Sequence, residues 1–198
     1  MSNLISVLGV SGVGKTAFVH ALAKAYPFKT AYEQHEERPF QALFKNDPRY
    51  ALANQIDYLL LRAEQEKELR ASAQMGLIDG GLDLDFHGFT RLFHSRGLLS
   101  DPEFDLCRRV YTLVRGFLPL PELIVRLRAD EITVAVRLAA RERINIARAA
   151  DTALFNSHLD EWLASAPSRR ILTLDVSSEA LEYEQSVGVV LDRMRQIF

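Results

Sequence analysis

Cysteine is nearly absent from the chain, because Cys107 is the only one. A single cysteine cannot form an internal disulfide, which excludes a disulfide-stabilised fold and favours a reducing compartment. Apolar residues make up 48% of the chain, yet no uninterrupted apolar run approaches the ~20 residues that span a membrane. We therefore expect no membrane segment, and we expect Cys107 to pack in the core as a small apolar residue.

An excess of charge of one sign is also lacking, since 24 basic and 26 acidic side chains leave a net charge of −2. This balance provides no basic field that would draw the protein to nucleic acid or to an anionic membrane. The first apolar run begins at Leu4, which leaves no room for a signal peptide. We expect one cytoplasmic domain over residues 1–198 that acts on small molecules.

Short apolar runs alternate with longer stretches of helical periodicity along the chain. This alternation predicts an α/β domain of three layers, in which crossover helices connect five parallel strands. The expected strands are Leu4–Leu8, Phe28–Tyr32, Gly76–Asp79, Glu122–Leu127 and Arg170–Asp175. The expected helices are Lys15–Ala25, about 37–45, Tyr50–Ala73, Asp85–Ser95, Pro102–Phe117, Asp130–Ala140, about 148–164 and Glu179–Ile197. In such a fold, ligands bind at the carboxyl ends of the strands.

Local signals set some of these helix ends. Asp101-Pro102 and Ser178-Glu179 each combine a polar capping residue with a compatible first turn, so a helix is expected to start at each. Gly97 is expected to end the helix before it, because glycine readily adopts the left-handed conformation that closes a helix.

The most specific motif follows the first strand directly and reads G-x-x-x-x-G-K-T over Gly9–Thr16. Its backbone amides are expected to point inward at phosphate oxygens; the residues are Gly9, Ser11, Gly12, Val13, Gly14, Lys15 and Thr16. Lys15 reaches the β- and γ-phosphates in such loops, and the hydroxyl of Thr16 ligates Mg²⁺. The motif predicts binding of a nucleoside triphosphate, with Lys15 accessible to solvent when no nucleotide is bound. The alternative is a glycine-rich turn with a surface lysine.

Carboxylates follow the second and third strands, at Glu33–Glu37 and at Asp79 to Asp85. At the edge that carries the phosphate loop, a carboxylate can hold Mg²⁺ or take the proton of an acceptor hydroxyl. The alternatives are a solvated acidic loop for the first group, a tight turn at Asp79-Gly80-Gly81, and a helix N-cap at Asp85.

Two further sets of polar residues lie on predicted helices. Gln55 and Arg62 are two turns apart and therefore share a face, where the glutamine amide suits the edge of a nucleobase. Arg137, Arg141 and Arg143 gather where a helix becomes a loop, and they are candidates for a lid over phosphates. Solvated side chains and an exposed basic helix end are the corresponding alternatives.

Taken in order, these motifs resemble the deoxynucleoside kinase family, and most of all its bacterial deoxyadenosine/deoxyguanosine kinase branch. The family pairs its phosphate loop with E-E-P-V-E-x-x-P, L-F-x-x-D-P, Q-x₆-R, [DE]-R-S-x-x-x-D and a lid R-x-x-x-R-x-R. The corresponding segments here begin at Tyr32, Leu43, Gln55, Asp79 and Arg137. The resemblance covers nearly the whole chain and implies a P-loop kinase fold with a lid around residues 137–147.

The resemblance also implies a role for each matching residue. Glu33 matches the general base toward the 5′-hydroxyl, and Asp79 matches the carboxylate that serves Mg²⁺. The residues implied to contact the base are Gln55, Arg62 and Asp85, and those implied to contact ATP and its transferring phosphate are Lys15, Arg137, Arg141 and Arg143. A homodimer through helices about 85–95 and 102–117 is implied as well, and both segments carry apolar residues on more than one face.

Three positions depart from the family pattern. Gly80 replaces the arginine of [DE]-R-S, Ile146 replaces the lid glutamate that binds the sugar 3′-hydroxyl, and Lys45 lies near a tyrosine position that supports the same hydroxyl. If an arginine was simply lost, Gly80→Arg is expected to raise activity. Three functions stay open: ATP- and Mg²⁺-dependent phosphorylation of a (deoxy)nucleoside, phosphorylation of another small acceptor such as a nucleoside monophosphate, and nucleotide binding with little turnover.

Overall fold

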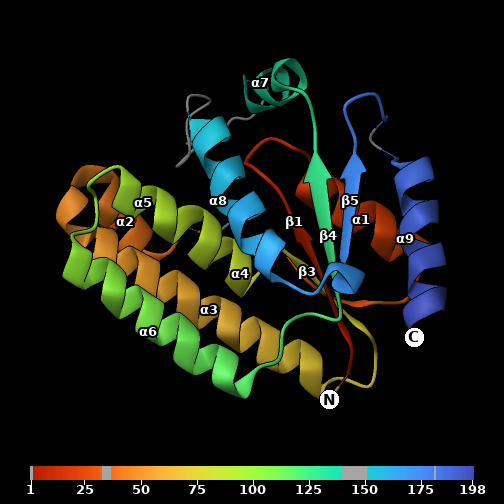
Figure 1. Cartoon of the computed structure of the whole chain (residues 1–198), viewed down its shortest axis with the longest axis horizontal. Coiled ribbons are helices and arrows are strands. Elements are labelled where there is room, and N and C mark those ends of the chain that lie inside the picture. Colours follow the sequence, from red (N-terminus) through yellow and green to blue (C-terminus); the bar gives the residue numbers. More distant parts are fainter. Residues whose placement is uncertain (1, 33–36, 140–150, 181) are drawn as a thin grey trace.

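The computed structural model describes residues 2–32, 37–139, 151–180 and 182–198 of the chain. They form a five-stranded parallel sheet in the order β2-β3-β1-β4-β5 (Figure 1). The strands are β1 (Leu4–Leu8), β2 (Lys29–Ala31), β3 (Gly76–Asp79), β4 (Leu123–Arg128) and β5 (Ile171–Asp175). The predicted α/β fold is confirmed, and the strand ends differ from the predicted ones by at most one residue.

Helices cover both faces of the sheet, which gives the three layers that the sequence predicts. In Figure 1, α8 crosses in front of the strands, α1 lies behind them, α9 lies at one side, and α3 and α6 lie at the other. The helices are α1 (Lys15–Ala25), α2 (Pro39–Asn46), α3 (Ala51–Ala71), α4 (Leu82–Leu84), α5 (Arg91–Ser95), α6 (Asp101–Phe117), α7 (Glu131–Ala139), α8 (Thr152–Ser165) and α9 (Glu184–Ile197). The described residues also form shorter turns, namely the 3₁₀ turns η1 (Pro48–Tyr50) and η4 (Ser168–Arg170) and the π-helical turn η2 (Asp85–Thr90).

The main core lies between the sheet and the helices on either face. Every residue of β1 is buried, as expected for a central parallel strand that is covered on both sides. Phe18 and Leu22 of α1 and Phe155 and Leu159 of α8 belong to this core. Cys107 is buried in a second cluster, in agreement with the apolar role predicted for it. Of the helices in the described part of the chain, none is long and apolar enough to cross a membrane.

Two helix ends agree with the prediction to within one residue, and one does not. Gly97 has a φ of 69° just after α5, and α6 begins at Asp101, one residue earlier than predicted. Its cap is therefore Ser100 and not Asp101, and the side chains of Ser100 and Glu103 form a capping box. The start predicted at Ser178-Glu179 is wrong, because α9 begins at Glu184. Glu179 instead caps this helix from a distance, since its carboxylate accepts hydrogen bonds from the backbone and hydroxyl of Ser186.

The segment predicted as one helix over Asp85–Ser95 consists of η2 followed by α5. Phe86, Leu92 and Phe93 of this segment are buried within the chain, so their apolar surplus is internal. On α6, by contrast, Leu113 and Phe117 are 64% and 74% exposed.

Candidate active site

The phosphate loop joins β1 to α1 at the carboxyl edge of the sheet. Its last residue, Thr16, donates a hydrogen bond from Oγ1 to Oδ2 of Asp79 over 2.5 Å. Asp79 ends β3, the strand beside β1, and it is buried. The structure therefore brings together the two residues that the sequence predicts for Mg²⁺.

This pair suits Mg²⁺, which is typically bound by one or two protein oxygens, with phosphate oxygens and water completing its octahedron. Within the described ranges, no group of three or more His, Cys, Asp or Glu side chains is placed to hold a metal by itself. A metal at Thr16 and Asp79 would accordingly depend on the nucleotide for its remaining ligands.

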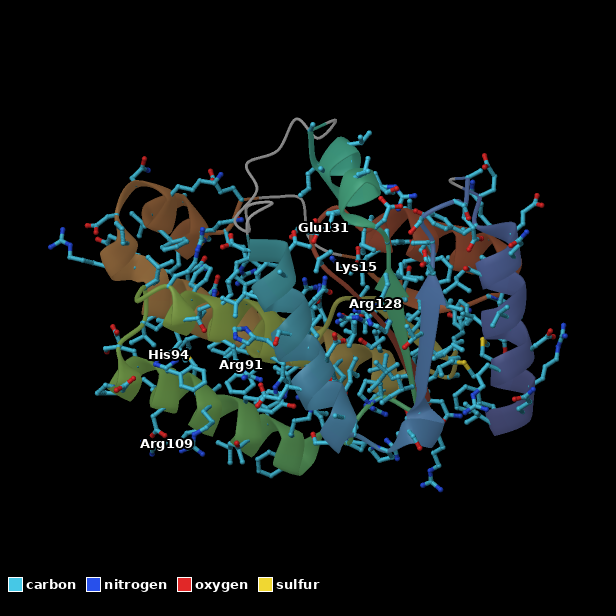
Figure 2. All side chains as sticks on the ribbon, turned by 45° about the horizontal axis from the view of Figure 1, so that its top comes forward. Lys15, Arg91, His94, Arg109, Arg128 and Glu131 are labelled. Atoms are coloured by element: carbon cyan, nitrogen blue, oxygen red, sulfur yellow. The ribbon has the colours of Figure 1, made fainter. Side chains whose placement is uncertain are left out.

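Lys15 is less accessible than predicted. Its side chain is buried, and Nζ donates to the carbonyl oxygens of Gly9 and Val10 at 3.1 and 3.3 Å. The ammonium group is thus held by the backbone of its own loop, since a buried charge needs hydrogen-bond partners to offset its desolvation. Figure 2 shows Lys15 at the same edge of the sheet as Arg128, the last residue of β4.

Two glycines of the loop need both their backbone angles and their small size. Gly12 and Gly14 have φ values of 87° and 108°. A Cβ on Gly12 would lie 2.6 Å from a side-chain carbon of Leu138, and one on Gly14 would lie 2.2 Å from the hydroxyl oxygen of Tyr183. The loop is therefore closely covered by α7 on one side and by the residue before α9 on the other.

Arg137 of α7 forms hydrogen bonds with the phosphate loop and with the end of β5. Its Nη1 donates to the carbonyl oxygen of Val13 at 2.7 Å, and its Nη2 donates to that of Val176, after β5, at 3.2 Å. This places a guanidinium group beside the loop. The side chains proposed to act with it, Arg141 and Arg143, lie outside the described residues, as do Glu33 and Ile146.

The residues predicted to contact a base meet on the side of the sheet that carries α3. Nε of Arg62 donates to Oδ2 of Asp85 at 2.7 Å, and both side chains are buried. Oε1 of Gln55 accepts a 2.9 Å hydrogen bond from the hydroxyl of Thr90. Asp85 and Thr90 are the two ends of η2, and π-helical turns of this kind are frequent at functional sites.

Asp85 is not the N-cap of a helix, because the short helix α4 precedes it. Gly80, just after β3, has a φ of 83°, and a Cβ there would lie 3.1 Å from Leu84 and 3.8 Å from Nη2 of Arg62. The side chain of Arg62 thus lies next to Gly80, the position at which the family pattern has an arginine.

Other basic residues near the predicted site have partners of their own. Arg38 pairs with Asp57 at 2.5 Å, and Lys45 pairs with Glu37. Arg91, labelled in Figure 2, pairs with Glu161 of α8 at 2.6 Å. These ion pairs give Arg38 and Arg91 roles away from the phosphate loop.

The sequence reasoning did not anticipate Thr90, Tyr183 or Arg126 near this edge. Tyr183 has a φ of 51°, and burial raises the pKa of its phenol. No local pattern in the sequence signals its contact with Gly14. Arg126 did leave a signal, because it is a charged residue inside the otherwise apolar strand Leu123–Leu127.

A parallel sheet with a glycine-rich phosphate loop, and with a Thr–Asp pair where that loop meets the neighbouring strand, is characteristic of the P-loop phosphotransferases. The sequence profile of the family described as "Deoxynucleoside kinase" matches residues 5–198, and the chain belongs to this family. It is accordingly a P-loop kinase, of a family that transfers phosphate to nucleosides.

Individual relatives are distant in sequence but similar over most of their length. The chain is 21% identical to a deoxyadenosine/deoxycytidine kinase of Bacillus subtilis over 99% of this chain and 93% of the relative. It is 26% identical to a deoxyadenosine kinase of Dictyostelium discoideum over 70% of this chain and 57% of the relative. Its fold matches the M. mycoides deoxyadenosine kinase with bound dCTP at a TM-score of 0.80 and 16% identity, covering 98% of this chain and all of that one.

Proposed function

We propose that the chain transfers the γ-phosphoryl group of ATP to the 5′-hydroxyl of a deoxynucleoside, with Mg²⁺. One observation carries this proposal. The segment Asp79–Asp85 contacts the phosphate loop at its first residue, through Thr16, and the base-binding candidate Arg62 at its last. A nucleoside held at Arg62 and Asp85 therefore lies next to a triphosphate held by the loop.

In the proposed reaction, Glu33 takes the proton of the 5′-hydroxyl as the oxygen attacks the γ-phosphorus. The bond between that phosphorus and the β–γ bridging oxygen breaks, and the second product is ADP. Bound Mg²⁺ would neutralise charge on the β- and γ-phosphates. Lys15 and the loop amides hold the donor phosphates in place, and Arg137, Arg141 and Arg143 offset the charge that develops on the transferring group.

Gln55, Arg62 and Asp85 are proposed to bind the base. Gln55 presents an amide, and Arg62 and Asp85 present a donor and an acceptor in a site that is shielded from water. The M. mycoides kinase has been seen with dATP and with the product dCMP, which supports a purine or cytosine deoxynucleoside as the acceptor.

A nucleotide-binding protein with little turnover is the second candidate. The positive φ of Gly80 favours it, because the backbone there does not suit the arginine of the family pattern. A kinase for nucleoside monophosphates is a third candidate, since a position without an arginine leaves more room for a larger acceptor.

A screen for ATP consumption over the deoxynucleosides and their monophosphates tests the proposal. We expect turnover with a deoxynucleoside, and we expect Glu33→Gln to lose about 10²-fold in kcat with little change in KM. Turnover with monophosphates alone would establish the third candidate, and nucleotide binding without turnover on any acceptor would establish the second. A Glu33→Gln variant within about twofold of wild type would remove Glu33 as the base.

We further propose that the protein is a cytoplasmic homodimer that pairs through α6. The exposed apolar side chains of this helix support the proposal, since Leu106, Leu113 and Phe117 are 40%, 64% and 74% exposed. Light scattering at micromolar concentration is expected to give twice the chain mass of 22.4 kDa. A wild-type protein that stays monomeric there would disprove the dimer.

A further inference from the structure

Arg126 is a buried arginine in the centre of the sheet. It belongs to β4, beside the last residue of β1, Leu8, which directly precedes the phosphate loop. Its side chain is 1% exposed. A charged group in a central strand costs free energy unless its donors are well paired.

The pairing of Arg126 is incomplete. Nη2 donates to Oδ1 of Asn156 at 2.6 Å and to Oδ1 of Asp160 at 3.2 Å, and Asp160 is 46% exposed. Among the described residues, Nε and Nη1 have no hydrogen-bond partner, although both are buried. Burial lowers the pKa of Arg126 to about 10, with Arg128 adding to the effect and Asp160 opposing it, so the group stays charged at neutral pH.

Strand register places Arg126 on the face of the sheet opposite α1. Paired residues of neighbouring strands point to the same face, and successive residues of a strand alternate. Asp79, Val7 and Val125 form one row, and the contact of Asp79 with Thr16 places that row on the α1 face. Arg126 is the next residue after Val125, and its contacts are with α8, on the opposite face.

Gly80 and Arg126 flank Leu8 on that opposite face. Gly80 follows Asp79 and donates its backbone N–H to Val7, and it accepts a 2.6 Å hydrogen bond from the hydroxyl of Ser6. With neighbouring strands about 4.8 Å apart, only one strand separates the two positions. A guanidinium group at 126 and one at 80 would therefore approach the same region from opposite sides.

We propose that Arg126 binds the 5′-phosphate of the nucleoside monophosphate formed in the reaction, and thereby stabilises the phosphoryl group during transfer. The inference rests on the proposed function. Nη2 shares one edge of the guanidinium group with Nε and the other with Nη1, so Nη2 together with either unpaired atom matches two oxygens of a phosphate in a bidentate contact. Because both atoms are covered, binding requires the side chain to turn toward the loop and exchange its single short bond to Asn156 for the phosphate.

Arg126→Met tests this inference, because it keeps an unbranched side chain and removes the charge and the donors. Replacing a poorly compensated buried charge with an apolar residue is often neutral or stabilising. The Tm of Arg126→Met is therefore expected to equal or exceed that of wild type. The kcat for a deoxynucleoside is expected to fall about 10²-fold. The rise in Tm on adding dAMP is expected to disappear, whereas the rises caused by ATP and by deoxyadenosine are expected to remain.

Arg128→Met is the matched control. Arg128 is on the same strand and also lies near Asp160, at 3.5 Å, but its side chain is 50% exposed. This variant is expected to retain its kcat and its response to dAMP. Arg126→Lys keeps the charge without the planar pair of donors, and it is expected to show a reduced dAMP response even if Arg126→Met fails to fold.

The inference is overturned if wild type gives no rise in Tm with dAMP. It is also overturned if a folded Arg126→Met, or Arg126→Lys when the first variant does not fold, keeps both the dAMP response and a kcat within about threefold of wild type. Failure of the proposed function is a separate result, since it would appear as wild-type protein without turnover on any deoxynucleoside. The thermal response to dAMP still judges Arg126 in that case.

Discussion

Arg62 and Asp85 form an ion pair shielded from solvent, with 2.7 Å between Nε and Oδ2 and side chains that are 4% and 7% exposed. The pair connects α3 to η2. Buried pairs of this kind often contribute little net stability, because desolvation offsets the attraction, but removing one partner leaves the other charge unpaired. Single and double replacements of Arg62 and Asp85 can therefore distinguish the effect of this pair on stability from its effect on acceptor binding.

We expect Arg62→Met and Asp85→Leu to lower the free energy of unfolding by about 3–5 kcal/mol each. The double variant is expected to recover most of this loss, because no unpaired charge remains. All three variants should lose acceptor binding and keep the affinity for ATP. Urea denaturation together with titrations of ATP and deoxynucleoside measures both effects. A double variant with normal acceptor affinity would show that the pair is structural.

Lys15→Ala is expected to weaken ATP binding strongly while the protein stays folded. Its ammonium group donates to the carbonyls of Gly9 and Val10, so its loss removes two hydrogen bonds, each worth about 1 kcal/mol. Isothermal titration with ATP and circular dichroism measure the two effects. Lys24→Ala, an exposed change on the same helix, should leave both unchanged. An unchanged affinity in Lys15→Ala would disprove the role of the phosphate loop.

The sheet and the Thr16–Asp79 contact were predictable because they depend on local pattern. A phosphate loop after an apolar strand fixes the position of Thr16. A carboxylate at the end of another parallel strand, such as Asp79 at the end of β3, lies at the same edge of the sheet. The contacts of Tyr183 and the start of α9 were not predictable, because they depend on groups distant in sequence. Glu179 lies in a segment that resembles a helix start, yet it caps Ser186 from outside the helix.

The burial of Lys15 was not predictable from the motif either. The motif shows what Lys15 contacts when nucleotide is bound, but not where the side chain turns otherwise. The π-helical form of η2 also has no local signal, since Asp85–Ser95 carries the apolar spacing of an ordinary helix.

Gly80→Arg is now expected to lower stability without raising activity, contrary to the expectation from the family pattern. A φ of 83° costs a residue with a side chain about 1–2 kcal/mol, and a Cβ there would lie only 3.1 Å from Leu84. Thermal unfolding and steady-state kinetics test this outcome.

Gly97→Arg is the control for the backbone cost. Gly97 has a φ of 69°, and a Cβ there would have no atom within 4 Å. The additional loss of stability in Gly80→Arg then measures its contacts with Leu84 and Arg62. A Gly80→Arg protein that is as stable as Gly97→Arg and faster than wild type would restore the lost-arginine interpretation.

His87 is expected to make the protein less stable as the pH falls. Its ring stacks on Trp162 with centroids 4.7 Å apart, and its Nε2 lies 3.0 Å from the hydroxyl oxygen of Tyr111. Because Tyr111 donates to Asp83, neutral His87 is the donor in its bond to Tyr111. Burial, followed by repulsion from Arg91 and Arg115, lowers the pKa of His87 from 6.5 to about 3.

The lowered pKa of His87 decides whether the free energy of unfolding rises or falls with pH. Above pH 6.5 both folded and unfolded states carry a neutral His87, so its contribution does not change with pH. Between pH 6.5 and 3 the unfolded state takes up a proton that the folded state does not, so the stability contributed by His87 is lost as the pH falls. The loss from this group is about 2 kcal/mol at pH 5.

His87→Gln keeps a hydrogen-bond donor for Tyr111 and removes the titration. Its free energy of unfolding, measured with urea at intervals from pH 7 to pH 5, is expected to decline less than that of wild type by about this amount. His94→Gln is the control, because His94 lies near the surface in a pair with the exposed Asp101. If wild type and His87→Gln lose stability in parallel, His87 takes up its proton in the folded state as readily as in the unfolded state.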